Sequence, residues 1–240
     1  MRLLLISNST NKGEEFLTYP MPHIKNFLGN TKTECLFIPY AGVSVTWDDL
    51  EKRVQPRFSG IGHSIKSIHH FDDPVKAVEN AEVIVVSGGS TWNLLYNVRK
   101  NDLIEAIRKK VMAGTPYIGW SAGSNLACPT IKTTNDMPVI DPVGFDALNL
   151  IPFQINPHYL GAEDDMNAKT HGGETREERI REFIQINKDV YVAGLREGCM
   201  FLVEDKKMTM IGKRTLRLFK HGMDPRELEP TEDLSFLLEK

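Results

Sequence analysis

The chain has 240 residues, of which 41% are hydrophobic and 25% charged, with 18 glycines and 13 prolines. This composition excludes a disordered tail, a collagen and a small module held together by disulfides. The 29 Lys and Arg against 32 Asp and Glu give a net charge of −3, and no basic block is long enough to follow a phosphate backbone. A nucleic-acid partner is therefore not expected.

The N-terminal apolar stretch, residues 3–6, is too short for a secretory signal, and residues 7–10 show no cleavage pattern. No later run approaches the roughly 20 apolar residues that a membrane-spanning helix needs. We therefore expect a cytoplasmic protein that does not enter a membrane. The cysteines, Cys35, Cys128 and Cys199, form no C-x-x-C pair, so buried free thiols are favoured over a metal or redox site.

The first half of the chain alternates short β-rich runs with longer segments of helical periodicity. We predict strands at residues 2–6, 35–39, 65–68, 83–86 and 117–119. We predict helices over residues 21–28, 47–58, 73–80 and 103–112. This alternation is typical of an α/β fold with a doubly wound, mostly parallel sheet covered by helices on both faces.

The pattern changes after residue 125. Pro-broken loops precede a charged helix predicted over 174–186, and β-like runs follow at 190–195, 200–204 and 208–211. No Gly/Ser-rich or Pro-rich linker separates these runs from the first half, so we expect them to extend the same sheet. Residues 1–240 are accordingly expected to form a single domain.

The segment from Tyr117 to Leu126 contains Gly119-x-Ser121-x-Gly123, the nucleophile-elbow pattern, in the strand-then-helix context that the pattern requires. A serine nucleophile needs a base within reach and backbone N–H groups aimed at the developing oxyanion, and a tight turn supplies both. The same residues would also suit a closely packed helix with Ser121 as its N-cap. Its position after a predicted central strand favours the nucleophile.

A second glycine loop, Ser87 to Thr91, follows another predicted strand. It lacks the spacing of a dinucleotide site and the ending of a P-loop, so a nucleotide is not indicated. We expect the N–H of Gly89 to face that of Ala122 across a developing oxyanion. An ordinary strand-to-helix turn would have the same sequence.

Among the seven histidines, His158 has the most constrained context. It follows Pro157 at the end of an apolar run, where the fixed φ of proline suits an imidazole held at a sheet edge. A single histidine is more often a surface or core residue than a catalytic one. Local chemistry alone therefore does not assign His158 a role.

Six segments together resemble the peptidase E family: residues 7–10, 37–41, 117–123, 133–138, 155–158 and 173–177, with the sequences SNST, FIPYA, YIGWSAG, TTNDMP, INPH and GETRE. The resemblance runs in order from about residue 2 to at least residue 200. It implies a class I glutamine-amidotransferase-like α/β fold and a cytoplasmic serine dipeptidase that cleaves after an N-terminal aspartate. It also implies no metal and no organic cofactor, and a small peptide as substrate. We expect a monomer or homodimer.

The resemblance implies that Ser121 is the nucleophile and His158 the general base. The orienting carboxylate is either Glu197 or Asp136, since both residue types can accept a hydrogen bond from an imidazole. We favour Glu197, because a short turn beside Gly198 after a predicted strand would bring its carboxylate to the same edge. Asp136 would then support the loop near the nucleophile, or cap a turn or helix.

Arg176 matches a basic position that the family is thought to use for the aspartyl side chain, and a guanidinium suits a carboxylate. The charges around it equally indicate an exposed helix start. Two features depart from the family pattern. Ser90 stands where asparagine is common, at a substrate-binding position beside the pocket, and the longer segment 159–172 carries acidic residues, Glu163, Asp164 and Asp165. Acids facing the cleft would repel an acidic substrate, so aspartate selectivity is left open.

Two alternatives follow from these departures. One is a related serine hydrolase of altered specificity, such as an amidase, an esterase or another peptidase. The other is a non-catalytic binding protein that retains the fold, with Ser90 as a first sign of drift. A cysteine-based amidotransferase is disfavoured, because serine occupies the elbow and Cys128 lies two helical turns further on.

Overall fold

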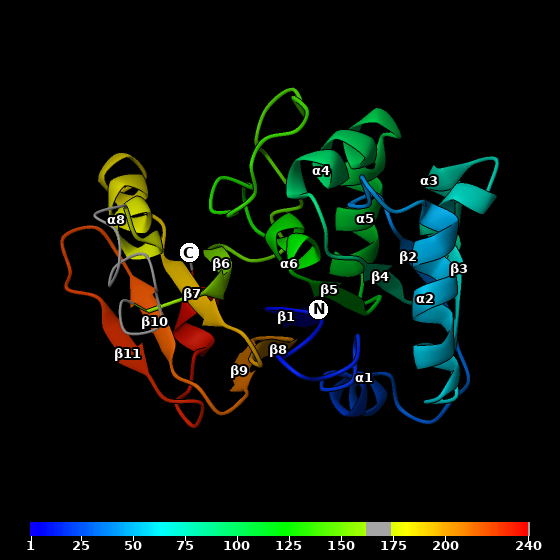
Figure 1. Ribbon diagram of the computed structural model, residues 1–240, viewed down its shortest axis with the longest axis horizontal. Coiled ribbons are helices and arrows are strands. Elements are labelled where there is room, and N and C mark those ends of the chain that lie inside the picture. The colour runs from blue at the N-terminus through cyan, green and yellow to red at the C-terminus, as the bar shows by residue number, and fades with distance from the viewer. Residues whose placement is uncertain (162–173, 240) are drawn as a thin grey trace.

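The computed structural model describes residues 1–161 and 174–239. One sheet contains β1 (Arg2–Ile6), β2 (Glu34–Ile38), β3 (Ser64–Ser67), β4 (Ile84–Val86), β5 (Tyr117–Trp120), β8 (Met200–Glu204) and β9 (Lys207–Ile211). A second contains β6 (Gln154–Tyr159), β7 (Val192–Arg196), β10 (Leu216–Phe219) and β11 (Arg226–Leu228). Within the described residues the strand orders are β3-β2-β4-β5-β1-β8-β9 and β11-β10-β7-β6. The two sheets lie side by side (Figure 1).

The first sheet is parallel from β3 to β1, and β8 and β9 continue it antiparallel. Successive side chains of a strand face opposite sides: in β1, Leu3 and Leu5 belong to one buried cluster, and Leu4 and Ile6 to another. The expected doubly wound, mostly parallel sheet is therefore confirmed for the first half of the chain.

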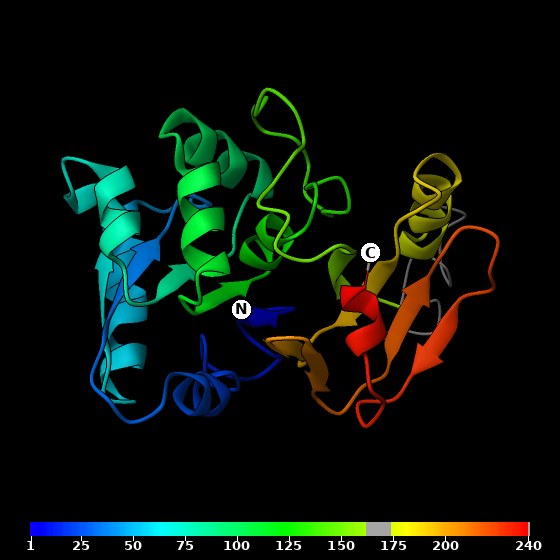
Figure 2. The ribbon, with the colours of Figure 1, turned by 180° about the vertical axis from the view of Figure 1, so that it is seen from behind.

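Helices cover both faces of this sheet (Figures 1 and 2). The cluster of Leu4 and Ile6 includes residues of α1 (Met21–Leu28) and α2 (Trp47–Ser59). The cluster of Leu3 and Leu5 includes residues of α3 (Pro74–Asn80), α4 (Thr91–Lys100), α5 (Leu103–Met112) and α6 (Ala122–Ala127). Helix α8 (Arg176–Ile186) packs on the second sheet, and the short 3₁₀ helices are η1 (Ile68–His70) and η2 (Ser235–Leu238). Among the described helices, none is long and apolar enough to cross a membrane.

The expectation that all three C-terminal β-runs extend the first sheet is wrong for one of them. Strand β7 instead lies between β6 and β10 in the second sheet, whereas β8 and β9 do extend the first. The second sheet was not predicted, because Pro157 interrupts the strand pattern of β6 and because β10 and β11 are short. Leu5 of β1 and Leu195 of β7 share one buried cluster. That residues 1–240 form a single domain stays a prediction. The buried cluster shared by the two sheets favours it.

The three cysteines are buried and free. Burial raises the pKa of the Cys35 and Cys128 thiols to about 12, so neither forms a thiolate near neutral pH. The sulfur of Cys128 accepts a hydrogen bond from the Ile155 N–H at 3.2 Å. These thiols therefore act as core groups, as the sequence indicated.

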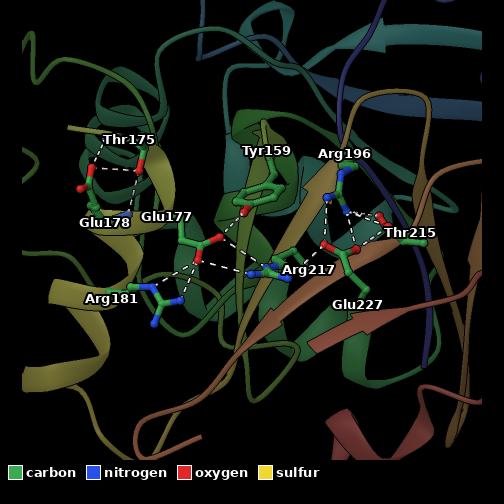
Figure 3. Close-up of polar contacts among 9 residues, drawn as sticks. All are labelled: Tyr159, Thr175, Glu177, Glu178, Arg181, Arg196, Thr215, Arg217 and Glu227. Carbon is green, nitrogen blue, oxygen red and sulfur yellow. Dashed lines mark hydrogen bonds and ion pairs between the residues drawn. The ribbon is translucent and has the colours of Figure 1, made fainter. Parts of the chain in front are cut away.

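Ion pairs join the strands of the second sheet to one another and to α8 (Figure 3). Arg196, at the end of β7, has a side chain only 4% exposed and donates to both carboxylate oxygens of Glu227, at 2.9 and 3.0 Å. Glu177 of α8 accepts from the Tyr159 hydroxyl at 3.1 Å and lies 3.4 Å from the Arg217 guanidinium. The network thus anchors Tyr159 and Arg196, which pair across β6 and β7.

This network predicts a loss of stability in acid. Burial disfavours the charged form of Glu227, but hydrogen bonds from Arg196 and Thr215 outweigh it and hold the pKa of Glu227 below its ordinary 4.5. A carboxyl with a lowered folded-state pKa stabilises the protein above pH 4.5, and that contribution is lost as the pH falls through the lowered value. We expect the free energy of unfolding in urea to decline below pH 4.5.

Glu227→Gln should lower that free energy by about 1 kcal/mol at pH 7, because the buried Arg196 loses its anionic partner, whereas water screens the carboxylate, which is 37% exposed. Its decline below pH 4.5 should also be shallower than that of the wild type. The exposed Glu229→Gln is the matched control and should behave as wild type. Equal stability and equal acid profiles for Glu227→Gln and wild type would contradict this role of the network.

Candidate active site

Ser121 lies at the sharp turn between β5 and α6. Its backbone has φ 53° and ψ −109°, a conformation that non-glycine residues rarely adopt, and its N–H donates to the Ile6 carbonyl at 2.9 Å. A Cβ atom on Gly119 would lie 2.5 Å from the Gly123 carbonyl oxygen, and one on Gly123 would lie 2.5 Å from that of Val86. The flanking glycines are therefore required for the strained turn to close on itself and to pack against Val86 of β4.

A continuous series of hydrogen bonds runs from Ser121 through His158 to Glu197. Oγ of Ser121 lies 2.9 Å from Nε2 of His158, and Nδ1 of His158 lies 2.7 Å from Oε1 of Glu197. The side chains of His158 and Glu197 are 35% and 43% exposed. Ser121 directly follows β5 of the first sheet, whereas His158 lies in β6 and Glu197 in the turn after β7. In this arrangement an imidazole can take a proton from serine while a carboxylate holds the ring.

A bulge in β6 directs His158 toward Ser121. The register of β6 against β7 shifts between Pro157 and Tyr159, and His158 between them has φ 54°. Ser7, directly after β1, secures the bulge: its hydroxyl accepts from the His158 N–H at 2.9 Å and donates to the Leu195 carbonyl at 2.8 Å. One buried hydroxyl thus joins the first sheet to both strands that carry the imidazole and its partner.

The neighbouring residue, Asn8, holds the turn that carries Glu197. Oδ1 of Asn8 accepts from the Gly198 N–H at 2.8 Å and from the Tyr19 hydroxyl at 2.6 Å. Gly198 has φ 80°, which favours glycine. Burial raises the pKa of Tyr19, so its hydroxyl stays a neutral donor. The end of β1 therefore positions both His158 and Glu197.

Asp136 occupies a different place. Its Oδ2 accepts from the Thr91 N–H at 2.5 Å, and its carbonyl accepts from the Trp92 indole at 3.1 Å. The carboxylate thus caps the N-terminus of α4, which is a favourable position for a negative charge. In the described part of the chain, Asp136 makes no hydrogen bond with His158. The structure brings Glu197, and not Asp136, to the imidazole.

A cavity of about 400 Å³ opens over Ser121 and His158. It is lined by Ser9, Phe16, Leu50, Arg53, Val54, Ser87, Gly88, Gly89, Trp120, Ser121, Asp136 and His158. The glycine loop packs tightly here: Gly89 has φ 137°, and a Cβ atom on it would lie 2.5 Å from the Ala41 carbonyl oxygen. Across residues 1–161 and 174–239, no acceptor takes the N–H of Gly89 or Ala122, so both amides stay available to a ligand.

Two other residues singled out in the sequence lie outside this cavity. The Ser90 hydroxyl accepts from the Asn93 N–H at 3.3 Å and caps α4. Arg176 begins α8 and lines a separate cavity of about 340 Å³ that also includes Asn135 and Asn156. The acidic segment with Glu163, Asp164 and Asp165 lies outside the described residues.

One residue of the cavity, Arg53, was not predicted from the sequence. This residue lies on α2 and lines the cavity of Ser121, and its guanidinium carbon lies 4.0 Å from the centre of the Phe16 ring. Nothing in the sequence distinguishes Arg53 from its charged neighbours, because only the packing of α2 against the first sheet brings it to the cavity. Ser7 and Asn8 were recognised only as members of a family segment, without their roles.

A strained serine on an α/β sheet, hydrogen-bonded to a histidine and through it to a glutamate, is the arrangement of a serine hydrolase. The model of peptidase family S51 matches residues 3–211. Peptidase E of Nostoc sp. is 49% identical over 239 residues, covering 100% of this chain and 97% of that protein. Peptidase E of Shigella flexneri serotype 5b is 46% identical over 229 residues, covering 95% and 98%.

The chain belongs to peptidase family S51 and is a serine-type peptidase, a dipeptidase of the peptidase E type. The fold is shared with two solved structures. A peptidase from an acI-B1 Actinobacterium has a TM-score of 0.69 at 17% identity, covering 98% of this chain and 96% of that one. A putative peptidase E protein from Listeria monocytogenes has a TM-score of 0.63 at 20% identity, covering 88% and 98%.

The position of Ser7 predicts a large effect of a small substitution. Ser7→Ala removes both hydrogen bonds that secure the His158 bulge, and displacing a reacting group by about 1 Å can cost a hundredfold in rate. We expect kcat for dipeptide hydrolysis to fall about 10- to 100-fold with a smaller change in KM. The exposed Ser44→Ala is the control. Unchanged kcat in a folded Ser7→Ala variant would contradict the role of this hydroxyl.

Proposed function

We propose that this chain hydrolyses dipeptides with an N-terminal aspartate, with Ser121 as nucleophile, His158 as general base and Glu197 as the carboxylate that orients the imidazole. The observation that carries the proposal is the hydrogen-bonded series from Ser121 to Glu197. It occurs in a chain that is 49% identical to a protein named peptidase E. We further propose that the protein acts in the cytoplasm as a monomer or homodimer.

Nε2 of His158 takes the proton of the Ser121 hydroxyl as Oγ attacks the peptide carbonyl carbon. The N–H groups of Gly89 and Ala122 donate to the oxyanion that forms, since the N–H of Ser121 itself already bonds Ile6. The imidazolium then protonates the leaving amine, and the peptide C–N bond breaks. Water, deprotonated by the same imidazole, hydrolyses the acyl-enzyme. Glu197 stays ionised and accepts from Nδ1–H throughout.

The substrate carries two carboxylates, on the aspartyl side chain and at the C-terminus, and two arginines are candidates to bind them. Arg176, in the separate cavity that Asn135 also lines, matches the family position for the aspartyl side chain. Arg53 lines the cavity of Ser121 itself, and stacking on Phe16 limits its rotamers. We propose that Arg53 binds the C-terminal carboxylate, which would limit the substrate to dipeptide length.

The assignment of the orienting carboxylate predicts unequal effects of two isosteric changes. Glu197→Gln should lower kcat by about a thousandfold, because the amide no longer holds the imidazole in the required tautomer and no longer stabilises the imidazolium. Asp136→Asn, which changes the cap of α4, should lower kcat by less than about tenfold. Steady-state kinetics with Asp-Leu separate the two. A larger loss in Asp136→Asn would reverse the assignment.

The two arginines predict separable selectivity changes in kcat/KM. Wild type should prefer Asp-Leu to Asn-Leu, and Arg176→Gln should reduce this preference by about 10- to 100-fold. Wild type should also prefer Asp-Leu to Asp-leucinamide, and Arg53→Gln should reduce that preference by a similar factor. Arg57→Gln, on the same helix but paired with Glu15 at 2.8 Å, is the control for Arg53.

Ser121→Ala should abolish all cleavage. If wild type cleaves Glu-Leu, Ala-Leu or simple esters instead of Asp-Leu, a serine hydrolase of altered specificity replaces the proposal. If it cleaves none of them, the binding-protein alternative is favoured. If Arg53→Gln lowers kcat/KM equally for Asp-Leu and Asp-leucinamide, Arg53 does not bind the C-terminal carboxylate. The rest of the proposal would be unaffected by that result.

A further inference from the structure

Two histidines and two carboxylates meet outside the active site, where the first turn of α2 packs against the end of β3. Asp48 and Glu51 lie three residues apart on α2, and His69 and His70 end η1. One ligand atom from each residue lies within 4.8 Å of the others. Nε2 of His69 is 2.9 Å from Oδ1 of Asp48, and Nε2 of His70 is 2.6 Å from Oε2 of Glu51 and 3.6 Å from Oδ1 of Asp48.

Further contacts hold two of these side chains in place. Nδ1 of His69 lies 2.6 Å from the Ser67 hydroxyl, and Oε1 of Glu51 accepts from the Ser67 N–H at 2.7 Å. These bonds leave Nε2 of His69 and Oε2 of Glu51 directed at the cluster. A metal-binding histidine is usually fixed through its second ring nitrogen in this way.

The exposure of the four side chains suits an ion arriving from solvent. His69 and Glu51 are only 16% and 19% exposed, whereas His70 and Asp48 are 41% and 60% exposed. His69 and Glu51 are thus largely buried and held by hydrogen bonds, whereas His70 and Asp48 are accessible to an ion from solvent.

The donor set matches a tetrahedral divalent cation. Ligand bonds of about 2.0–2.1 Å place the ligand atoms of zinc about 3.4 Å apart. Three of the separations between ligand atoms are 2.6, 2.9 and 3.6 Å, and the others are within 4.8 Å, so small side-chain shifts would bring the four atoms to that spacing. Imidazole nitrogens with carboxylate oxygens suit Zn²⁺ and its late first-row neighbours, and lack the thiolates that select Cu(I). We propose that Asp48, Glu51, His69 and His70 form a Zn²⁺-type cation site, which goes beyond the proposed peptidase activity.

An ion at this site would tie α2 to η1. The same helix carries Leu50, Arg53 and Val54 to the wall of the Ser121 cavity. The cation would therefore stabilise the helix that forms one wall of the candidate active site, without contacting Ser121 or His158.

The test is isothermal titration calorimetry of Zn²⁺ into the full, untagged, chelator-treated chain, with Co²⁺ absorption to report tetrahedral coordination. We expect one ion per chain, the visible bands of four-coordinate Co²⁺ and a raised Tm. His70→Gln and Glu51→Gln should each weaken binding at least about 10-fold, the smallest loss usual for a disturbed metal shell. His23→Gln, which removes a histidine of α1, and His158→Gln, which excludes zinc at the candidate active site, should bind as wild type.

Circular dichroism confirms that each variant is folded. The proposal is overturned if wild type takes up no stoichiometric ion, since the four residues then form only a hydrogen-bonded ion-pair cluster. It is equally overturned if both cluster variants bind zinc as wild type does, or if His158→Gln alone abolishes binding. Peptidase activity is not needed for any of these readouts, so failure of the proposed function would leave them unaffected.

Discussion

The Ser7 hydroxyl joins the two sheets, and the geometry of the candidate active site depends on that junction. The nucleophile candidate comes from the first sheet, whereas the imidazole and the carboxylate come from the second. Ser7 lies at the end of β1, accepts from the His158 N–H and donates to the Leu195 carbonyl. Because an unsatisfied buried polar group costs about 1–3 kcal/mol, these bonds strongly favour one relative position of the two sheets. That position places Nε2 of His158 within 2.9 Å of Ser121 Oγ.

The two sheets contribute different parts of the candidate site. The parallel sheet supplies the strained turn at Ser121 and the amides of Gly89 and Ala122, and its close glycine packing keeps these groups fixed. The second sheet supplies His158 on a bulge and Glu197 in a turn. The residues next to these, Tyr159 and Arg196, are anchored by ion pairs and hydrogen bonds to Glu177 and Glu227 (Figure 3). The strain at Ser121 and His158 is therefore held by the surrounding structure and not by the residues themselves.

The first sheet was predictable because its signals are local. Continuous apolar runs mark buried parallel strands, and Gly119-x-Ser121-x-Gly123 marks a turn whose glycines have no room for a Cβ atom. The second sheet was not predictable. Pro157 interrupts the strand pattern of β6, and the hydrophobic pattern of β7 differs little from that of β8. Its strand partners are set by contacts distant in the chain, such as the pair of Arg196 with Glu227.

The candidate site was predictable only in part. Local chemistry indicated Ser121, whereas His158 and Glu197 depended on family resemblance, since a single histidine or glutamate carries no local signal. Resemblance alone left Glu197 and Asp136 as alternatives, and the hydrogen bond of His158 to Glu197 favours Glu197. Two further features could not be predicted, because both depend on the packing of α2. That packing brings Arg53 to the cavity of Ser121, and it brings Asp48 and Glu51 to His69 and His70.

The proposed hydrolysis depends on the activation of Ser121 as a nucleophile by His158. The most direct measurement is the rate and site of labelling by a fluorophosphonate probe, read by mass spectrometry of peptide digests of wild type and His158→Gln. We expect a single adduct, on Ser121, that forms readily in wild type and is nearly absent in the folded variant. An adduct on another residue, or labelling of Ser121 at the same rate in both proteins, would contradict it.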